Sequence, residues 1–439
     1  MLRNYLQVAF SVLSRNKFFT CISLFGISFT LLILMLIAGY LQAELGDAPP
    51  LGNKDKILLL SQLRLEYVRT DTTLTLDTVY QDGQMRVDTT KAIGAPYNEM
   101  VNQSAFSREF LEKHLLDLPE VEQYAFYSPW HRFDLYVNGG KIPIEAIYAD
   151  PAFWEIFDFR LLEGRFWGAS DQVQAAPVAV ITDELARQYF GQEHGAAGKE
   201  MELDGKAFTV VGVVAKATAS FDPVTVQAYL PSALFQEPRN SHVEYMGQHM
   251  AVFMGKNLAQ MKRSLEHRAA QIPMPNSDFN VLRLIAASHA EAMAWKIIYD
   301  PDPAKSKRIA VSILIGLIGL FTLLPALNLV NLNTSRLLER SGEIGVRKAF
   351  GAHSGHILLQ FVVENVVLTL IGGLIALLLA IPLARVLNAS KVLGPTALAL
   401  DFRFWLYGLL IALLFGVLTG LLPAWRMSRA YIVESLKHQ

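Results

Sequence analysis

The sequence predicts an α-helical membrane protein with four transmembrane helices and a large mixed α+β extracytoplasmic domain between the first and the second helix. Of its 439 residues, 52% are hydrophobic and 18% are charged. This is too apolar for an ordinary soluble protein and too charged for a chain that lies wholly within a membrane. Apolar runs of the ~20 residues that span a bilayer as a helix stand at the start and in the last third of the chain. Residues 44–308 between them have the mixed composition of a folded domain.

The start of the chain predicts a surface helix followed by a span. Residues 1–17 carry basic side chains and no acid, and their apolar side chains recur at helical spacing. This favours an amphipathic helix on the cytoplasmic membrane surface over a simple charged flank. Residues 18–43 contain no charge and exceed the apolar core of a secretory signal peptide. Because Leu41-Gln42-Ala43 is a poor cleavage site, we expect a retained transmembrane helix.

Residues 44–308 predict a domain that folds outside the membrane. Strand-like runs alternate there with turn signals, and the clearest are residues 56–60, 133–137 and 208–214. Asn138-Gly139-Gly140 after the second run is a hairpin signal. Helical patterns cover residues 108–116 and 183–190, the latter with Thr182 or Asp183 as its cap. The region is long enough to build its own core, in two lobes.

Methionines stand out in the less readable part of this domain, and they are Met246, Met250, Met254 and Met261. The first three are four residues apart, a spacing that suits the buried face of a helix. An adaptable, methionine-lined binding surface is the alternative interpretation.

Further spans are predicted in the last third of the chain, at residues 309–332, 361–387 and 404–425. Together with the first span they bring both ends of the chain to the same side of the membrane. Basic residues occur at both ends, in residues 1–17 and in the tail 426–439. Since an excess of Lys and Arg in short segments marks the cytoplasmic side, both termini are expected there, and residues 388–403 form a short outer loop.

The connector at residues 333–360 joins the second span to the third. Its charged residues are mostly basic, which indicates the cytoplasmic side, and they include Arg336, Arg340, Arg347 and Lys348 against Glu339 and Glu343. Glu364 lies near the cytoplasmic start of the third span, where an ionisable side chain is a functional candidate. An ion pair with Arg347 or Lys348 is the structural alternative. Pro325 and Pro382 can bend their helices, either to transmit motion or as simple packing kinks.

Several stretches resemble the MacB/FtsX-type family of ABC transporter permeases. Within the connector, Glu343-Ile344-Gly345-Val346-Arg347-Lys348-Ala349-Phe350-Gly351-Ala352 is similar to the family's coupling signature. A series similar to its periplasmic domain comprises residues 150–157, 162–166, 177–181 and 208–214. Leu422-Pro423-Ala424-Trp425-Arg426 resembles the end of its last span. Gly164 and Gly212 in the periplasmic series are interpreted as turn or close-packing positions.

The resemblance implies a machine driven by ATP, which a separate ABC ATPase would bind together with Mg²⁺. The residues that would dock onto this ATPase are Glu339, Arg340, Glu343, Ile344, Gly345, Arg347, Lys348, Phe350, Gly351 and Ala352. Glu364, Pro325 and Pro382 would transmit the movement through the spans. A homodimer, or a heterodimer with a similar permease, is implied in the inner (plasma) membrane of a bacterial cell. A periplasmic membrane-fusion protein and an outer-membrane channel are further implied partners.

No catalytic, cofactor or metal site is predicted in this chain. The sequence has no G-x-x-x-x-G-K-[ST] phosphate loop, no H-E-x-x-H and no G-x-S-x-G. His353 and His356 lie three residues apart without a third ligand, which favours ordinary surface residues. Cys21 is the single cysteine, so no disulfide forms within the chain. The net charge of -1 argues against a nucleic-acid partner.

Two functions are compatible with this pattern. The first is export of an amphiphilic substrate, such as a drug, a peptide or a lipoprotein, by a non-catalytic permease subunit. The alternative is an FtsX-like regulator, in which the same ATPase-driven movement controls cell-wall hydrolases and moves no solute. A membrane-anchored enzyme is disfavoured, because the catalytic patterns are missing and a coupling signature would serve no purpose there.

Overall fold

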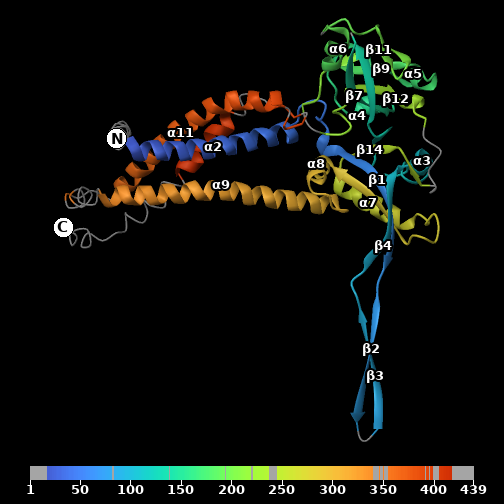
Figure 1. Cartoon of the computed structure of the whole chain (residues 1–439), viewed down its shortest axis with the longest axis horizontal. Helices are drawn as coiled ribbons and strands as arrows, with labels where there is room; N and C mark the ends of the chain where they lie inside the picture. Colours follow the sequence, from blue (N-terminus) through green and yellow to red (C-terminus); the bar gives the residue numbers. More distant parts are fainter. Residues whose placement is uncertain are drawn as a thin grey trace. The chain divides into compact units, whose positions relative to one another are not determined.

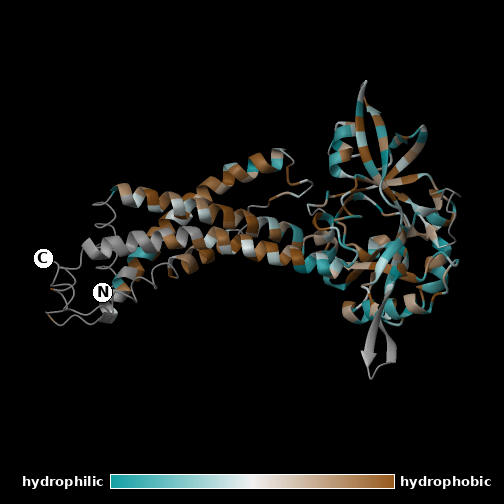
Figure 2. Cartoon of the chain, turned by 60° about the horizontal axis from the view of Figure 1, so that its bottom comes forward, coloured by the Kyte–Doolittle hydropathy of each residue, from teal (hydrophilic) through white to brown (hydrophobic). Residues whose placement is uncertain are grey.

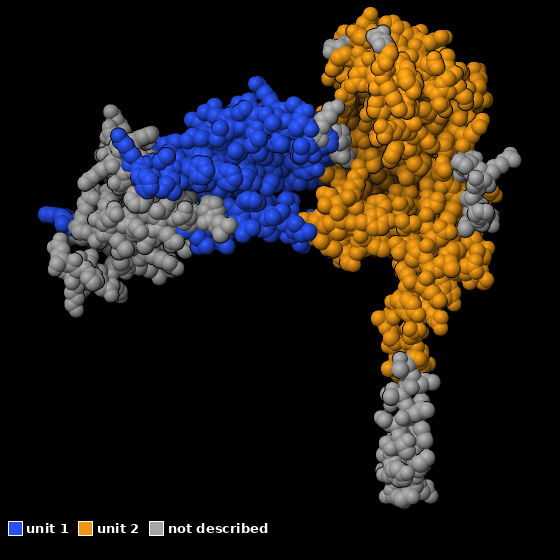
Figure 3. Space-filling model, in the orientation of Figure 1, with its two compact units in different colours: residues 1–46, 311–439 blue, residues 47–310 orange. Residues whose placement is uncertain are grey.

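The computed structural model describes residues 17–81, 84–137, 139–192, 194–218, 221–236, 245–339, 346, 350, 354–390, 392–394, 396–398 and 405–417. Within these ranges, the side chains of residues 19, 73–90, 324–326, 328–339, 354, 356–358 and 361 are not described. The chain divides into two compact units (Figure 3). Residues 1–46 and 311–439 form the first, called here the helical unit, and residues 47–310 form the α/β domain.

Long apolar helices make up most of the helical unit. They are α2 (Lys17–Leu45), α9 (Pro303–Glu339), whose first residues belong to the α/β domain, and α11 (Ser354–Ser390). Among the described residues, the segments long and apolar enough to cross a membrane are Thr20–Leu45, Pro303–Leu323 and Val362–Ser390. Figure 2 shows hydrophobic residues along most of these helices. They overlap the first three spans expected from the sequence.

The fourth expected span, residues 404–425, is described only in part. A shorter apolar helix covers Trp405–Val417, which by itself falls short of the ~20 residues needed to cross a bilayer. Residues 418–425 lie outside the described part of the chain. A fold with four spans therefore stays a prediction.

The long helices reach further into the connector than the sequence predicts. α9 continues to Glu339, beyond the expected end at residue 332, and α11 begins at Ser354, before the expected start at residue 361. The reason lies in residues such as Leu337 and Leu338, which are strong helix formers whether or not they lie in a membrane. Both ends of the connector are therefore helical.

One thirteen-stranded sheet runs through the α/β domain. Its strands are β1 (Ile57–Arg69), β4 (Tyr97–Phe106), β5 (Gln123–Tyr127), β6 (His131–Val137), β7 (Gly140–Ala149), β8 (Leu161–Gly164), β9 (Val178–Thr182), β10 (Glu200–Leu203), β11 (Lys206–Val214), β12 (Ala228–Pro231), β13 (Met246–Gly247), β14 (Met250–Met254) and β15 (Val281–Ser288). The main order is β10-β11-β9-β12-β7-β5-β14-β1-β4-β13, while β15 pairs with β1, β6 with β7 and β8 with β11. Only β9 with β11 and β7 with β12 are parallel among the described pairs.

The sheet has two lobes, and β5 and β7 are the neighbouring strands between them. Figure 1 shows β7 and β9 in one lobe and β1 and β14 in the other. We call residues 129–236 the β9 lobe and residues 47–128 with 245–302 the β1 lobe. The β9 lobe carries α4 (Phe153–Ile156), α5 (Ala169–Val173), α6 (Asp183–Phe190) and the 3-10 helix η2 (Ser232–Leu234). The β1 lobe carries the 3-10 helix η1 (Lys54–Lys56), α3 (Arg108–His114), α7 (Leu258–Gln271) and α8 (His289–Ile297).

A hairpin that the sequence patterns do not predict lies between β1 and β4. β2 (Thr72–Gln81) and β3 (Gln84–Ile93) form a separate two-stranded antiparallel sheet. The register pairs Thr72 with Ile93 at one end and Gln81 with Gln84 at the other. Figure 1 shows the hairpin extending away from the rest of the domain.

Local predictions in the domain are confirmed where a cap or a turn residue defines them. The hydroxyl of Thr182 accepts a hydrogen bond from the amide of Leu185 at 3.3 Å and so begins α6. The predicted helix at residues 108–116 is α3, which begins after the cap Ser107. β6 and β7 are antiparallel on either side of the predicted turn, where Gly139 has a φ of +78°.

The helical interpretation of the methionines is wrong. Met246 lies in β13, and Met250 and Met254 lie in β14, because the backbone here pairs with β4 and β5. Met246 and Met261 are 5% and 0% exposed. These two side chains therefore fill the core of the β1 lobe.

Candidate functional site

The predicted coupling segment is the first candidate site. Glu339 is the last residue of α9, and Phe350 lies in a turn. The other predicted coupling residues lie outside the described part of the chain, and they are Arg340, Glu343, Ile344, Gly345, Arg347, Lys348, Gly351 and Ala352. Their role stays a prediction.

Two apolar side chains of this segment are exposed. Phe350 is 89% exposed and Val346 is 57% exposed. The amide of Phe350 donates to the carbonyl of Val346 at 3.1 Å, which places the two residues one helical turn apart. Burying a side chain of this size stabilises a complex by about 2 kcal/mol. Phe350 is thus an exposed apolar side chain of the predicted coupling segment.

Glu364 lies in the first half of α11 and is partly buried. Its Oε1 accepts a hydrogen bond from the side-chain amide of Gln360 at 3.0 Å, one helical turn earlier. Gln360 is itself 8% exposed. The predicted alternative partners, Arg347 and Lys348, lie outside the described residues, so an ion pair with either stays a prediction.

The two prolines of the spans lie inside continuous helices. α11 runs from Ser354 to Ser390 through Pro382 without a break. Pro325 lies within α9, which is also continuous from Pro303 to Glu339. If these prolines transmit movement, as predicted, they do so by bending a continuous helix and not by interrupting it.

α2 and α11 approach closely through small residues. Gly372 of α11 faces α2, and a Cβ atom placed there would lie 2.6 Å from Cγ2 of Ile27. Gly408 of the short apolar helix is similarly close to Met35, at 2.9 Å from its Cε. Small residues of this kind allow helix backbones to approach each other in membranes. The buried contacts include Leu31, Met35, Leu368 and Leu377.

Replacing Gly372 by leucine is expected to destabilise this packing by about 2 kcal/mol, because the added side chain overfills a closely packed contact. The measurement is the midpoint of unfolding of the purified chain in mild detergent. Gly316→Leu in α9 is the matched control, since a Cβ atom at Gly316 meets nothing within 4 Å. Equal midpoints for the two variants would show that α2 and α11 do not pack as described.

A buried carboxylate lies near the C-terminal end of α2 in the helical unit. Glu44, near the end of α2, is 0% exposed, and the hydroxyl of Thr396 donates a hydrogen bond to its Oε1. Asn388 binds the backbone of Leu398 twice, donating to its carbonyl at 3.2 Å and accepting from its amide at 2.9 Å. The predicted loop at residues 388–403 is thus tied to the ends of α2 and α11. Sequence reasoning missed this contact, because 352 residues separate Glu44 from Thr396.

The stretch Asp150 to Phe157, part of the resemblance, builds an aromatic core. Phe153 and Phe157 are 0% exposed, with ring centroids 4.7 Å apart. Trp154 stacks on Phe166 at 4.5 Å and meets Tyr229 edge-on at 5.3 Å. These side chains stabilise the domain by packing.

His289 is a buried titratable side chain of α8. It is 3% exposed, and its Nε2 has no hydrogen-bond partner among the described residues. Burial, together with the positive charges of Lys54 and Lys296, lowers the pKa of His289 from 6.5 to about 4, against an opposing effect of Asp55. The folded state therefore binds a proton here less readily than the unfolded state.

Acidification is expected to destabilise the α/β domain through this histidine. The pKa is lower in the folded state, so the stabilisation is complete above about pH 6.5 and is lost as the pH falls toward 4. The slope reaches at most ~1.4 kcal/mol per pH unit. Chemical unfolding at pH 7 and pH 5 measures it. His289→Leu should flatten the slope and the exposed His267→Leu should not; the reverse result would contradict the assignment.

Metal ligands do not gather in the described part of the chain. No group of three or more His, Cys, Asp or Glu side chains there could hold a metal ion. His353 and the side chain of His356 do not belong to the described part of the chain. The expectation that they are ordinary surface residues therefore stays untested.

Two family profiles match the chain. The MacB-like periplasmic core domain matches residues 20–267, and the FtsX-like permease C-terminal region matches residues 315–432. The first match covers most of α2 and the α/β domain as far as residue 267, within α7. The second covers most of α9, the connector and α11.

Curated relatives are similar at lower identity. The pyoverdine export ATP-binding/permease protein PvdT of Pseudomonas syringae pv. syringae is 27% identical over 313 residues, which is 68% of this chain and 45% of PvdT. The macrolide export ATP-binding/permease protein MacB of Bdellovibrio bacteriovorus is 25% identical, over 66% of this chain and 43% of MacB. The chain thus spans about half the length of these relatives. The uncharacterized ABC transporter permease YknZ of Bacillus subtilis is 23% identical, over 65% of this chain and 68% of YknZ.

A solved structure of the periplasmic region of MacB from Actinobacillus actinomycetemcomitans is also similar, with a TM-score of 0.36 and 12% identity, over 57% of this chain and 95% of that one. Because this TM-score is low, the family assignment rests on the sequence profiles and not on the structural similarity. Because the core-domain profile alone covers more than half of the chain and the permease profile covers the helices that follow, the chain belongs to the MacB/FtsX-type family of ABC transporter permeases.

Proposed function

We propose that this chain is the permease subunit of an ABC exporter that couples ATP hydrolysis by a separate ATPase to conformational change in its α/β domain. The observation that carries the proposal is the order of the two matched regions in one chain, a MacB-like core domain followed by an FtsX-like permease region. A large folded domain between two apolar helices, with a charged connector further on, is the arrangement that such coupling needs. The α/β domain would lie outside the cytoplasm.

The proposed topology has four spans and cytoplasmic ends in the inner membrane. The basic connector supports it, since short basic segments remain in the cytoplasm. An ATPase that binds ATP and Mg²⁺ would dock there, and the exposed Phe350 is the described side chain best placed to insert into it. Glu343, Arg347 and Lys348 are the charged residues proposed to orient the contact.

A second permease chain is proposed to complete the transporter. Apolar side chains of α9 are exposed along the apolar segment, from 36% at Ile309 to 64% at Ile315. Such a surface is stable only against lipid or against another protein. We propose a homodimer or a heterodimer with a similar permease, joined on the outer side by a membrane-fusion protein and an outer-membrane channel.

The proposed substrate is amphiphilic. Relatives are named for the export of pyoverdine and of macrolides, and this supports export over import. A drug, a peptide or a lipoprotein fits the same class. The chemistry of the described residues does not select among them.

The test is purification of the full chain from its native membrane in mild detergent, followed by mass spectrometry of the proteins that accompany it. A co-purifying ABC ATPase that is lost when residues 341–352 are scrambled supports the proposal. The matched control scrambles residues 204–207 in the turn and first residues of β11, which should retain the ATPase. Absence of any ATPase under several gentle conditions would overturn the proposal. A cell-wall hydrolase on the outer domain, without a membrane-fusion protein, would favour the FtsX-like regulator.

A further inference from the structure

A short stretch of backbone pairing joins the two lobes of the α/β domain. The amide of Ser128 donates to the carbonyl of Tyr148 at 2.8 Å, and the amide of Asp150 donates to the carbonyl of Phe126 at 3.0 Å. β5 and β7 share one residue pair, Tyr127 with Ala149, whereas β5 shares five pairs with β14 and β7 shares four with β12. Two side chains lengthen the junction. The hydroxyl of Ser128 accepts from the amide of Tyr148 at 3.0 Å, and Oδ2 of Asp150 accepts from the amide of Phe126 at 3.3 Å.

The two faces of the sheet differ at this junction. On one face a single hydrophobic core crosses from lobe to lobe, and its members include Ile57, Tyr127 and Val252 of the β1 lobe with Ile147, Ala149 and Tyr229 of the β9 lobe. Neighbouring residues of a strand point to opposite faces, so Phe126, Tyr148 and Asp150 lie on the other face. There the cores are separate, one confined to the β1 lobe and one to the β9 lobe.

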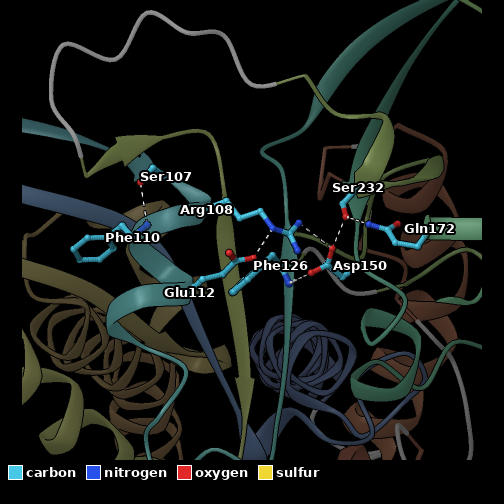
Figure 4. Close-up of polar contacts among 8 residues, drawn as sticks. All are labelled: Ser107, Arg108, Phe110, Glu112, Phe126, Asp150, Gln172 and Ser232. Atoms are coloured by element: carbon cyan, nitrogen blue, oxygen red, sulfur yellow. Dashed lines mark hydrogen bonds and ion pairs between the residues drawn. The ribbon is translucent and has the colours of Figure 1, made fainter. Parts of the chain in front are cut away.

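A polar bridge links residues of the two lobes on this face (Figure 4). Asp150 is 14% exposed, and its Oδ1 accepts from Nη1 of Arg108 at 3.4 Å and from the hydroxyl of Ser232. Gln172 donates its amide to the same Ser232 hydroxyl at 2.5 Å. Arg108, Asp150 and Ser232 together are called the interlobe bridge.

Each end of the interlobe bridge is anchored in its own lobe. Arg108 is the first residue of α3, whose Phe110 and Leu111 are buried in the β1-lobe core. Its Nε also donates to Glu112 at 2.8 Å, and its guanidinium lies 5.3 Å from the ring centroid of Phe126. Ser232 is 7% exposed and follows β12 directly in the β9 lobe. A change in the angle between the lobes must therefore alter the contacts of Asp150.

The Arg108–Asp150 contact of the bridge is weak enough to open. The Arg108 side chain is 40% exposed, and ion pairs with that much solvent access contribute little to overall stability. Opening would leave the two lobe cores and the shared core on the opposite face intact. The shared core is then the natural pivot, as in hinge movements between packed parts.

We propose that the interlobe bridge holds the two lobes in one orientation, and that its opening lets the domain bend about the shared core on the opposite face. Asp150 is the positioning residue. The inference deepens the proposed function, because ATP-driven movement requires an element with two arrangements in the outer domain. All residues of the interlobe bridge come from this chain, so the bridge forms without a partner protein.

The experiment measures the distance between the lobes in the full chain. Nitroxide labels are placed at the exposed positions Lys206→Cys in the β9 lobe and Glu266→Cys in the β1 lobe, in a Cys21→Ser background. Pulsed electron resonance should give one main distance for the otherwise unchanged chain. Arg108→Ala is expected to raise the population at a second distance about threefold to tenfold. Asp150→Asn, which preserves shape, should raise the same population.

Two control variants remove comparable contacts that do not cross the junction. Arg165→Ala breaks an arginine–aspartate pair of 2.7 Å with Asp171 inside the β9 lobe, and Glu112→Ala removes the other partner of Arg108 inside the β1 lobe. Both should leave the distances unchanged. Identical distances for Arg108→Ala and the unchanged chain, or equal broadening in the controls, would overturn the proposal. Since no ATPase takes part, that result would leave the proposed function standing, and loss of the ATPase partner would leave the distances unaffected.

Discussion

Replacing Glu343 and Arg347 together by alanine is expected to uncouple ATP hydrolysis from export, while the chain still inserts into the membrane. If these residues orient the docked ATPase, their loss removes a coupling free energy of the usual 1–3 kcal/mol. The stimulation of ATPase activity by the permease should then fall by about tenfold. The measurement is ATPase activity of the reconstituted complex with and without the variant chain, at equal amounts of inserted protein.

The matched control for this pair removes one acid and one base elsewhere. Glu200→Ala with Lys206→Ala alters exposed residues on β10 and β11 and should preserve stimulation. Phe350→Ala tests the same contact through its apolar side, since the ring is 89% exposed in the chain alone. If stimulation were unchanged in both the Glu343/Arg347 and the Phe350 variants, the coupling assignment would be refuted.

Replacing Gly164 by alanine is expected to destabilise the α/β domain more than any other glycine-to-alanine change proposed for it. Gly164 has a φ of +72°, and a Cβ atom there would lie 2.1 Å from the carbonyl oxygen of Val211. The left-handed conformation alone costs a residue with a side chain about 1–2 kcal/mol. Displacing the neighbouring strand adds about 1–3 kcal/mol. A total loss of roughly 2–5 kcal/mol in the free energy of unfolding follows.

Gly205→Ala separates these two causes. Gly205 has nearly the same φ, +74°, but a Cβ atom there meets nothing within 4 Å. It should therefore show only the conformational cost, about 1 kcal/mol. Chemical unfolding followed by domain fluorescence measures both variants. If Gly164→Ala unfolded at the same denaturant concentration as Gly205→Ala, the close approach of β8 to β11 would be wrong.

Much of the local structure could be predicted because its causes lie within a few residues. Uncharged apolar runs indicate spans, Thr182 caps α6, and a turn that includes Gly139 lies between β6 and β7. The glycine interpretation of Gly164 and Gly212 also agrees with the structure, where each approaches a neighbouring backbone. The methionine spacing predicted a helix where the structure has strands. A spacing of four residues does not reveal that this backbone pairs with neighbouring strands, and that pairing decides its conformation.

The candidate sites also differ in whether their residues are close together in the sequence. The basic residues of the connector and its resemblance to the family's coupling signature indicate it as a candidate site directly. This is possible because its residues follow one another in the chain. The interlobe bridge could not be predicted, because Arg108, Asp150 and Ser232 meet only after β5, β7 and β12 are placed in one sheet. The same holds for Glu44 and Thr396 at the end of α2.

By itself, the sequence determined the membrane character of this protein, the position of its folded domain and its family, because hydrophobic run length and motif order are properties of the chain. The tertiary structure decided which face of the sheet carries a core shared by both lobes and which face carries the Arg108–Asp150 contact between them. It also decided that His289 is buried and that Phe350 is exposed. Burial and long-range polar contacts depend on how distant segments pack, and that information is not local to any stretch of sequence.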